Sequence, residues 1–130
     1  MNAGQLLHAG GVDSVRVRLL IQPIEPDSVS VRPAPRLLQR VWGREIRAMT
    51  LRNTILLDPT LLAAAQDRAG TLLIHELVHV RQWHDLGVSR FLWRYLTGYL
   101  RGRFDGLGHR GAYLGIPLEV EARESAALFG

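Results

Sequence analysis

The sequence predicts an α+β fold in which a small antiparallel or mixed sheet precedes several helices. Two strand-like runs, residues 45–51 and 54–57, follow each other closely. Residues 71–103 have the apolar spacing of two consecutive helices, and a last helix is predicted over 118–128. At 130 residues the chain is long enough for one domain with its own core, so we expect a single domain, 1–130.

The N-terminal third carries weaker signals. Residues 1–13 are Gly-rich and are expected to be flexible. Residues 15–21 begin with alternating apolar and charged side chains, which predicts a strand. A short helix fits residues 27–31, whereas 37–41 fits either a helix or a strand. Four prolines divide this connecting region, at positions 23, 26, 33 and 35.

The middle of the chain predicts a hairpin followed by a helix. Its two strands are joined across Arg52-Asn53, where an Asn tolerates positive φ. Asp58-Pro59-Thr60 is typical of a helix start, because Asp58 or Thr60 can cap and proline suits the first turn. The pattern over 61–69 is helical.

Two helices follow. Residues 71–86 are apolar on most sides, which predicts a buried helix that ends at Gly87. Residues 90–103 carry two apolar rows at a spacing of four, with arginines among them. This helix either packs in the core with its arginines reaching to solvent, or lies against a membrane or a partner. Glycines then mark a loop over 102–111, and the last helix ends before Gly130.

The run His75-Glu76-Leu77-Val78-His79 lies within the first of these helices and matches the pattern H-E-x-x-H. Residues four apart share a helix face, so His75 and His79 can direct imidazole nitrogens at one Zn²⁺. Glu76 lies beside the pair and could take a proton from a zinc-bound water. Buried His and Glu need partners, and a metal would satisfy them together.

Catalytic zinc requires a third protein ligand. Asp85 lies six residues after His79, but Gln82 replaces the mid-segment glycine that would let such a residue turn back, and His84 is more suited to packing or hydrogen bonding. Asp105 and His109 lie in the Gly-rich loop, where nothing positions them. Glu119 and Glu121 open the last helix, from which a carboxylate could be presented rigidly.

His75–His79 followed by Glu119-Val120-Glu121-Ala122-Arg123 resembles the gluzincin pattern, H-E-x-x-H plus a later E-x-E-A-D helix. Residues 45–125 are also similar to a zincin-like domain of unknown function linked to bacterial extracellular contractile injection systems. The resemblance implies a zincin-like fold, zinc as cofactor and Glu119 as third ligand, with Glu121 in reserve. Arg123 stands where the pattern has an Asp that supports a ligand histidine.

The resemblance also implies further roles. Glu124 or Asp85 would orient a ligand in place of the missing Asp. Zinc peptidases often stabilise the oxyanion with a Tyr or His, which makes Tyr113 and His109 the expected groups, although Tyr113 also suits an ordinary core position. An edge strand beside the active-site helix, expected at Thr54–Leu57, would hold an extended peptide by backbone pairing.

The amino-acid composition excludes some kinds of ligand and binding partner. The chain has no cysteine, which excludes disulfides and thiol ligands. All 16 basic residues are arginine, but they form no block, so nucleic-acid binding is not expected despite the net charge of +4. No transmembrane run or secretory signal is recognisable, which predicts a cytoplasmic protein or one exported by a non-classical route.

Two functions follow from these patterns. The first is a zinc-dependent peptidase acting on a peptide or protein substrate. The second is a non-catalytic zincin-like module that docks into a larger assembly and holds its metal with four protein ligands. A basic module associated with a membrane or a nucleic acid remains a third alternative, and strong salt dependence of binding would favour it.

Overall fold

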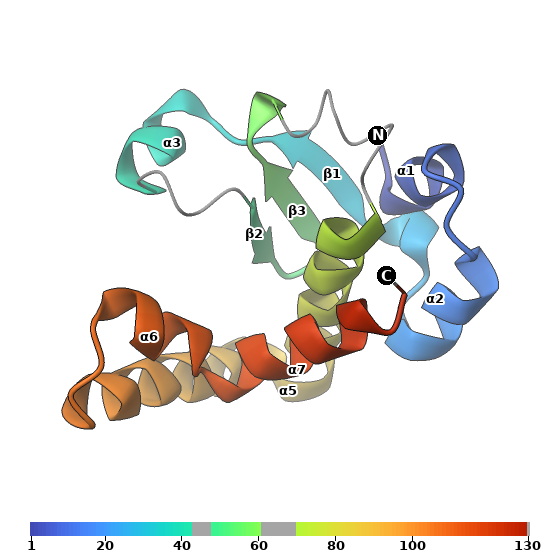
Figure 1. Ribbon diagram of the computed structural model, residues 1–130. Helices are drawn as coiled ribbons and strands as arrows, with labels where there is room; N and C mark the ends of the chain where they lie inside the picture. Colours follow the sequence, from blue (N-terminus) through green and yellow to red (C-terminus); the bar gives the residue numbers. More distant parts are fainter. Residues whose placement is uncertain (43–47, 61–69, 130) are drawn as a thin grey trace.

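The fold is mixed α+β, with a three-stranded mixed sheet and mostly helices around it (Figure 1). The computed structural model describes residues 1–42, 48–60 and 70–129. The predicted start of the first hairpin strand at 45–47, the predicted helix over 61–69 and the end at Gly130 lie outside the described residues.

The sheet contains β1 (Ser30–Pro33), β2 (Ala48–Leu51) and β3 (Thr54–Leu57), in the order β1-β3-β2. β3 pairs parallel with β1 and antiparallel with β2. The predicted hairpin is therefore confirmed over the described residues. The positive φ in its turn, +56°, belongs to Arg52 and not to Asn53. β1 was not predicted, since it falls partly in the segment expected to form a short helix.

The N-terminal predictions are wrong in two places. Residues 1–13 contain the helix α1 (Ala3–Ala9), capped by reciprocal hydrogen bonds between Asn2 and Gln5. Residues 15–21 form the helix α2 (Ser14–Ile21) instead of a strand. The Asp13 side chain caps α2 by accepting the first free N–H groups, and this local bond outweighs the strand preference of the β-branched residues that follow.

Two short elements complete the N-terminal third. The helix predicted over 27–31 is reduced to the single 3₁₀ turn η1 (Pro26–Ser28). The undecided segment 37–41 is helical, in α3 (Arg36–Trp42). The outer side of β1 is paired at its start, because Ala3 N–H donates to the Val29 carbonyl and Val31 N–H donates to the Met1 carbonyl.

Three helices form the C-terminal half, α5 (Gly70–Phe104), α6 (His109–Leu114) and α7 (Pro117–Ala127). α5 is two helices joined at Gly87, whose φ of +78° and ψ of 167° break the helical path as predicted. The first half passes by the sheet, and the second runs beneath α6 and α7 (Figure 1). α6 occupies part of the segment predicted as a loop.

Two glycines let the second half of α5 approach its neighbours closely. A Cβ built on Gly98 would lie 3.0 Å from Pro117 Cδ, and one on Gly102 would lie 2.8 Å from Ala112 Cα. Both are shorter than ordinary carbon contacts, so a side chain at either position would push α6 and α7 away. Gly98 therefore lets the start of α7 lie close against α5, and Gly102 does the same for α6.

The core has two parts. The larger lies between the sheet, α1, α2 and the first half of α5, and its fully buried members include Leu6, Ile21, Ile55, Ile74 and Leu77. The smaller lies where the second half of α5 meets α6 and α7, and consists of Trp83, Phe91, Ile116 and Leu118 with partly buried aromatic neighbours. The first half of α5 and α7 connect the two parts.

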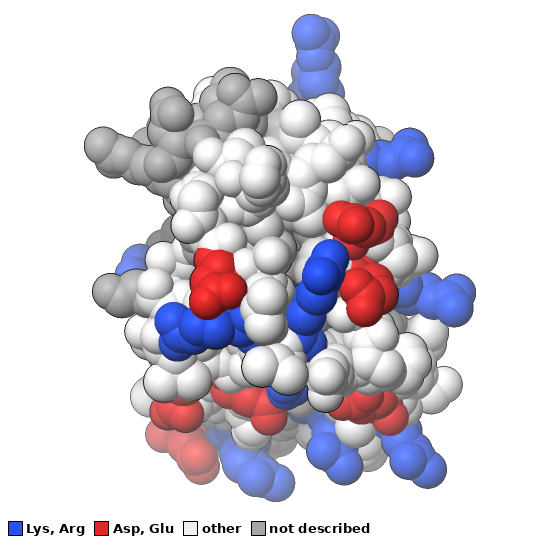
Figure 2. Space-filling view, turned by 90° about the vertical axis from the view of Figure 1, so that its right-hand side faces the viewer, with Lys and Arg blue, Asp and Glu red and all other residues white. Residues whose placement is uncertain are grey.

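The side of the molecule formed by α1 and α2 has a mixed charge (Figure 2). Arginine and carboxylate side chains are interspersed there, and one pair joins Arg18 to Glu25 at 3.4 Å. In the described part of the chain, no helix combines the length and apolarity needed to cross a membrane.

Candidate metal centre

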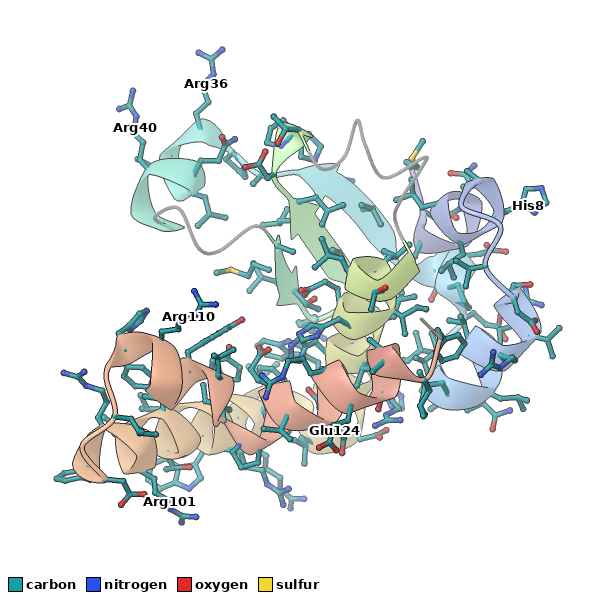
Figure 3. All side chains as sticks on the ribbon, in the orientation of Figure 1. His8, Arg36, Arg40, Arg101, Arg110 and Glu124 are labelled. Carbon is teal, nitrogen blue, oxygen red and sulfur yellow. The ribbon has the colours of Figure 1, made fainter. Side chains whose placement is uncertain are left out.

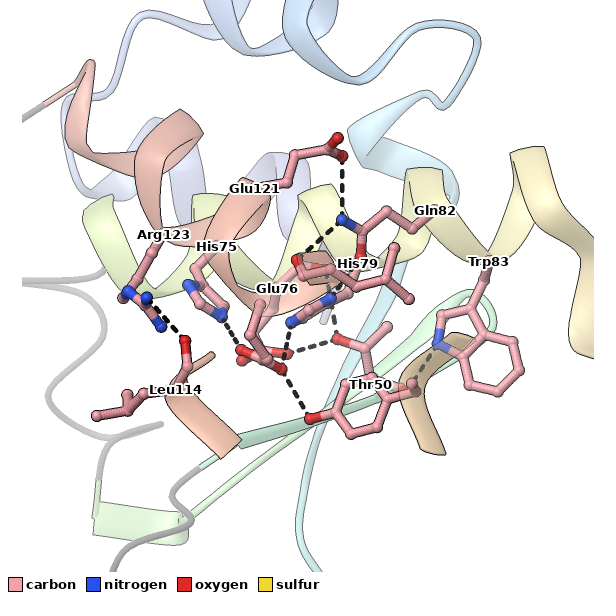
Figure 4. Close-up of polar contacts among 12 residues, drawn as sticks. Thr50, His75, Glu76, His79, Gln82, Trp83, Leu114, Glu121 and Arg123 are labelled. Carbon is pink, nitrogen blue, oxygen red and sulfur yellow. Dashed lines mark hydrogen bonds and ion pairs between the residues drawn. The ribbon is translucent and has the colours of Figure 1, made fainter. Parts of the chain in front are cut away.

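Three side chains of ligand type converge between α5 and α7. His75 and His79 are one turn apart on α5, and Glu119 lies in the first turn of α7, after Pro117. His75 Nε2 is 3.0 Å from Glu119 Oε2, and His79 Nε2 is 2.9 Å from Glu119 Oε1 (Figure 4). The atoms of these three side chains that could bind a metal lie within 4.8 Å of one another. The structure thus brings together the ligand set predicted from the sequence.

Burial makes the charges at this cluster interdependent. His79 and Glu119 are buried, and His75 is partly exposed. Burial alone would raise the pKa of Glu119, but hydrogen bonds from His75 and His79 outweigh it and hold that pKa below its usual range. Burial alone would lower the pKa of His79, but the same carboxylate raises it. The Glu119 carboxylate therefore keeps its negative charge in the cluster and favours a positive charge beside it.

Gln82 fixes which nitrogen of His79 faces the cluster. Its amide Nε2 lies 3.0 Å from both the Leu118 carbonyl and Glu121 Oε1, which can only accept. Its Oε1 therefore faces His79 Nδ1, at 2.8 Å, and that nitrogen must carry the proton. His79 Nε2 of the neutral ring then presents a lone pair to Glu119.

A lone pair and a carboxylate oxygen 2.9 Å apart need a positive charge between them. Either a second proton on His79 or a bound cation supplies it. Two imidazole nitrogens and one carboxylate are a donor set that zinc accepts in catalytic sites, with a further position left open. The donor set and the orientation imposed by Gln82 fit a divalent metal such as zinc.

Glu76 lies next to this cluster and is held by β2. The Thr50 hydroxyl donates to Glu76 Oε2 at 2.6 Å, and the Trp83 indole donates to the Thr50 carbonyl at 3.2 Å. Burial raises the pKa of Glu76, while His79 and the Thr50 hydrogen bond lower it. The carboxylate that the motif predicts as a base is thus fixed in orientation beside the three candidate ligands.

Two tyrosines lie on the other side of Glu119. The Tyr95 hydroxyl donates to Glu119 Oε1 at 2.9 Å, and burial raises its pKa. Burial and the nearby Glu119 carboxylate raise the pKa of Tyr113 to about 12. Both hydroxyls therefore keep their protons at neutral pH and can donate a hydrogen bond.

A pocket of about 310 Å³ opens at the cluster. Its polar lining comes from Glu76, His79, Glu119 and the two tyrosines, and its apolar lining comes from β2 and α5. The apolar members are Ala48, Met49, Leu51, Trp83, Phe91 and Leu92. A few converging polar groups in a mostly apolar hollow are typical of sites for small molecules or single side chains.

The other sequence candidates lie elsewhere. Glu121, the reserve ligand, accepts hydrogen bonds from Arg81 at 2.7 Å and from Gln82, and it is half exposed. Asp85 and His84 are exposed and contact each other at 3.3 Å. These three side chains do not face the pocket, so the structure does not support a ligand role for them.

Most of the residues that were expected to orient a ligand or to stabilise the oxyanion also lie outside the pocket. Arg123 donates to the Leu114 carbonyl at 2.9 Å and thereby ties α7 to the end of α6. Glu124 points outward from α7 (Figure 3). His109 contacts the Tyr99 hydroxyl at 2.9 Å outside the pocket lining. Only Tyr113, among the expected oxyanion groups, lines the pocket.

The expected substrate strand needs a correction. β3 (Thr54–Leu57) lies in the centre of the described sheet, between its two neighbours, and so offers no free edge. β2 is one of the two edge strands of the described sheet, and all four of its residues line the pocket. The order is decided by the parallel pairing of β1 with β3, and β1 was not recognisable in the sequence.

Four residues of the site were missed by sequence reasoning: Thr50, Gln82, Trp83 and Tyr95. Gln82 could have been found, because it lies three residues after His79 on the same helix face. Tyr95 belongs to an apolar row that favours a packing position. Thr50 and Trp83 carry no local signal, since their roles depend on how β2 lies against α5.

Comparison of the chain with family models, with curated proteins and with solved structures found no match.

Proposed function

We propose that this chain is a zinc-dependent peptide hydrolase with a gluzincin-type site on a zincin-like fold. The observation that carries the proposal is the convergence of His75, His79 and Glu119 next to a buried Glu76. The two histidines and Glu76 come from one helix and the third ligand from the opening turn of a later helix, as in the pattern that the sequence resembles.

The metal would be held by His75 Nε2, His79 Nε2 and the Glu119 carboxylate. When bound there, zinc would lower the pKa of a water molecule and polarise a substrate carbonyl. Gln82 keeps the His79 tautomer that leaves Nε2 free to bind. Tyr95, by donating to Glu119 Oε1, restricts the rotation of that carboxylate.

Glu76 is the general base in this proposal. The Thr50 hydroxyl fixes one of its oxygens, which leaves the other oriented for a proton at the reacting water. Glu76 would pass that proton to the leaving amine. Tyr113 lines the same pocket with its proton retained, so it would donate to the oxygen that becomes negative during attack.

The peptide substrate would extend along β2. β2 is an edge strand of the described sheet, and one acceptor on its open side, the Thr50 carbonyl, already accepts from Trp83, so a peptide would pair with the remaining groups of that side. An extended peptide could pair with this edge and place one side chain in the apolar part of the pocket.

The rival function, a non-catalytic docking module, predicts a closed site with four protein ligands. Among the described residues, the cluster offers three such ligands and adjoins a pocket. These two observations favour the hydrolase, because an open position is what a catalytic metal requires.

Substitution of Glu76 tests the reaction. Zinc-loaded wild type should cleave members of a broad peptide mixture, as read by mass spectrometry. Glu76→Gln should keep its zinc and lose about 10²- to 10⁴-fold in rate, because the base is removed and the ligands are not. Glu124→Gln, the same change on an outward-pointing carboxylate of α7, should leave the rate unchanged. Equal rates for wild type and Glu76→Gln would exclude the proposed mechanism.

Substitution of the two nearby glutamates tests the metal site separately. Glu119→Gln should lose bound zinc in elemental analysis after dialysis against a weak chelator. Glu121→Gln should retain it, because Glu121 lies outside the cluster and a glutamine oxygen at this position can still accept from Gln82. Full zinc retention in Glu119→Gln would remove Glu119 from the ligand set.

A further inference from the structure

The second half of α5 exposes a continuous apolar face. Phe91, Tyr95 and Tyr99 turn inward to the smaller core. The neighbouring row, spaced by four residues, instead faces solvent and consists of Val88, Leu92, Leu96, Leu100 and Phe104, with Trp93 beside it. Trp93 is 68% exposed and Phe104 is 87% exposed. We call these six residues the apolar stripe.

The stripe is long and winds part of the way around the helix, because residues four apart are offset by about 40° around its axis. From Val88 to Phe104 the helix extends about 25 Å at the standard rise per residue. Single exposed apolar residues are normal, but an unbroken row that includes two large aromatic side chains marks a surface that another phase or molecule covers. The sequence favoured a helix packed in the core, and the structure buries only the row that begins at Phe91.

A row of arginines borders the stripe. Arg90, Arg94 and Arg101 are exposed and lie on one side of the same helix, next to Trp93 and Phe104 by helical position. Arg101 projects away from α7 (Figure 3). The chain contains no Asp or Glu between Val88 and Phe104, and none of the described acidic side chains forms an ion pair with these three arginines. The border therefore carries net positive charge, with Asp105, four residues after Arg101, as the nearest acidic residue in the sequence.

We propose that the apolar stripe and its arginine border bind the surface of an anionic lipid bilayer. A helix with Leu, Trp and Phe on one face and Arg beside them lies in the plane of the membrane interface. The apolar side chains enter the acyl boundary, and the arginines reach the lipid phosphates. The occupant is identified by charge complementarity, because the border offers only positive charge.

Packing against a second copy of the chain would not use this charge. A contact between two stripes would leave the arginines of each copy without an acidic partner in the other stripe. The stripe segment itself holds no carboxylate to pair with them. A bilayer with negative head groups satisfies both the apolar and the charged part of the surface.

Membrane binding would place the pocket opening close to the bilayer surface. Leu92 belongs to the stripe and also lines the pocket beside the metal cluster. A bilayer that covers the stripe would therefore lie next to the pocket opening. This inference does not depend on the proposed hydrolase, since the stripe contains none of the candidate ligands.

Binding is measured by co-sedimentation of the full chain with vesicles. Vesicles of phosphatidylcholine with phosphatidylserine should bind the protein, and vesicles of phosphatidylcholine alone should bind it far more weakly. Arg94→Glu with Arg101→Glu should weaken binding to anionic vesicles by at least about 30-fold, since each lost basic residue costs about fivefold. The matched control is Arg36→Glu with Arg40→Glu on α3, which project from the opposite side of the molecule and should leave binding unchanged (Figure 3).

The apolar contribution is tested in the same assay. Leu96→Ser should weaken binding, whereas Leu19→Ser, at a similarly exposed position on α2, should not. Trp93 fluorescence should shift to shorter wavelength on binding, and Trp93→Phe should abolish the shift, because Trp83 is already buried and Trp42 belongs to α3. Circular dichroism of each variant checks that it is folded.

Three results would overturn the inference. The first is equal binding to neutral and anionic vesicles, or none to either. The second is equal loss of binding in the α3 control. The third is a dimer in analytical ultracentrifugation that Leu96→Ser converts to a monomer without any vesicle binding, which would assign the stripe to a second copy of the chain.

Discussion

At the scale of single residues, Gln82 orients His79 within the candidate metal cluster. Gln82 bonds three groups at once: His79 Nδ1, the Leu118 carbonyl and Glu121. The last two bonds orient the amide, and the amide in turn fixes the histidine tautomer. One side chain thereby links the start of α7 to the ligand helix.

Replacement of this side chain should weaken metal binding. Gln82→Met keeps the length and apolar volume but removes the acceptor for His79 Nδ1. Zinc affinity, measured by competition with a chromogenic chelator, should fall about 10- to 100-fold. Gln39→Met is a matched control on α3, where the amide donates to the Ala34 carbonyl, and it should not change the affinity. An unchanged affinity in Gln82→Met would show that the cluster orients His79 without it.

At the scale of elements, the helices of the C-terminal half follow from local sequence. The helix break at Gly87 and the start of α7 at Pro117 lie where glycine and proline predict them. The N-terminal third was less readable, because Asp13 and Asn2 cap helices in segments whose composition favours a strand or a loop. Val17 and Ile21, four residues apart, are both fully buried, which the alternating start of that segment concealed.

The backbone conformation of Gly87 should make any substitution there destabilising. Gly87→Ala places a Cβ in open space but in a backbone region that is nearly restricted to glycine. It should lower the free energy of unfolding by about 1–3 kcal/mol in urea denaturation. Gly108→Ala, also in open space but at a φ of −67°, should cost far less. Equal losses would mean that the break in α5 has another cause.

At the scale of the whole molecule, the site joins parts that are distant in the chain. β2 contributes Thr50, α5 contributes both histidines, and α7 contributes Glu119. The metal-free protein must therefore bury a charged cluster when it folds. Its stability should depend on pH through the shifted pKa values of that cluster.

The metal-free protein should be most stable between about pH 4.5 and 6.5. The pKa of Glu119 is lowered from 4.5, because bonds from the histidines outweigh burial, so its contribution is lost as pH falls below that value. The pKa of His79 is raised from 6.5, because the Glu119 carboxylate outweighs burial, so its contribution is lost as pH rises through the folded pKa. Burial raises the pKa of Glu76, which also favours the lower part of this window.

Urea midpoints across this range measure the effect. Glu119→Gln should flatten the profile on both sides, since the variant removes the charge to which both shifts respond. Glu121→Gln, on a half-exposed carboxylate, should keep the wild-type shape. A flat profile in the metal-free wild type would show that the cluster does not carry these charges.

The sequence alone determined which side chains could bind a metal. The spacing of His75 and His79 follows from the helix repeat, and the choice of Glu119 followed from a resemblance to a two-helix pattern. Gly87 and Pro117 were recognisable because their effects are confined to one or two residues. Such features can be predicted without knowing the tertiary contacts of the residues.

Only the tertiary structure decided how these residues are supported. The place of β2 at the sheet edge, the bond from Thr50 to Glu76 and the exposure of the apolar stripe depend on which elements pack together. Packing of this kind joins residues that are far apart in the chain, and a local pattern is equally compatible with a buried or an exposed row. The sequence therefore predicted which side chains would come together as candidate ligands, and the fold decided their partners.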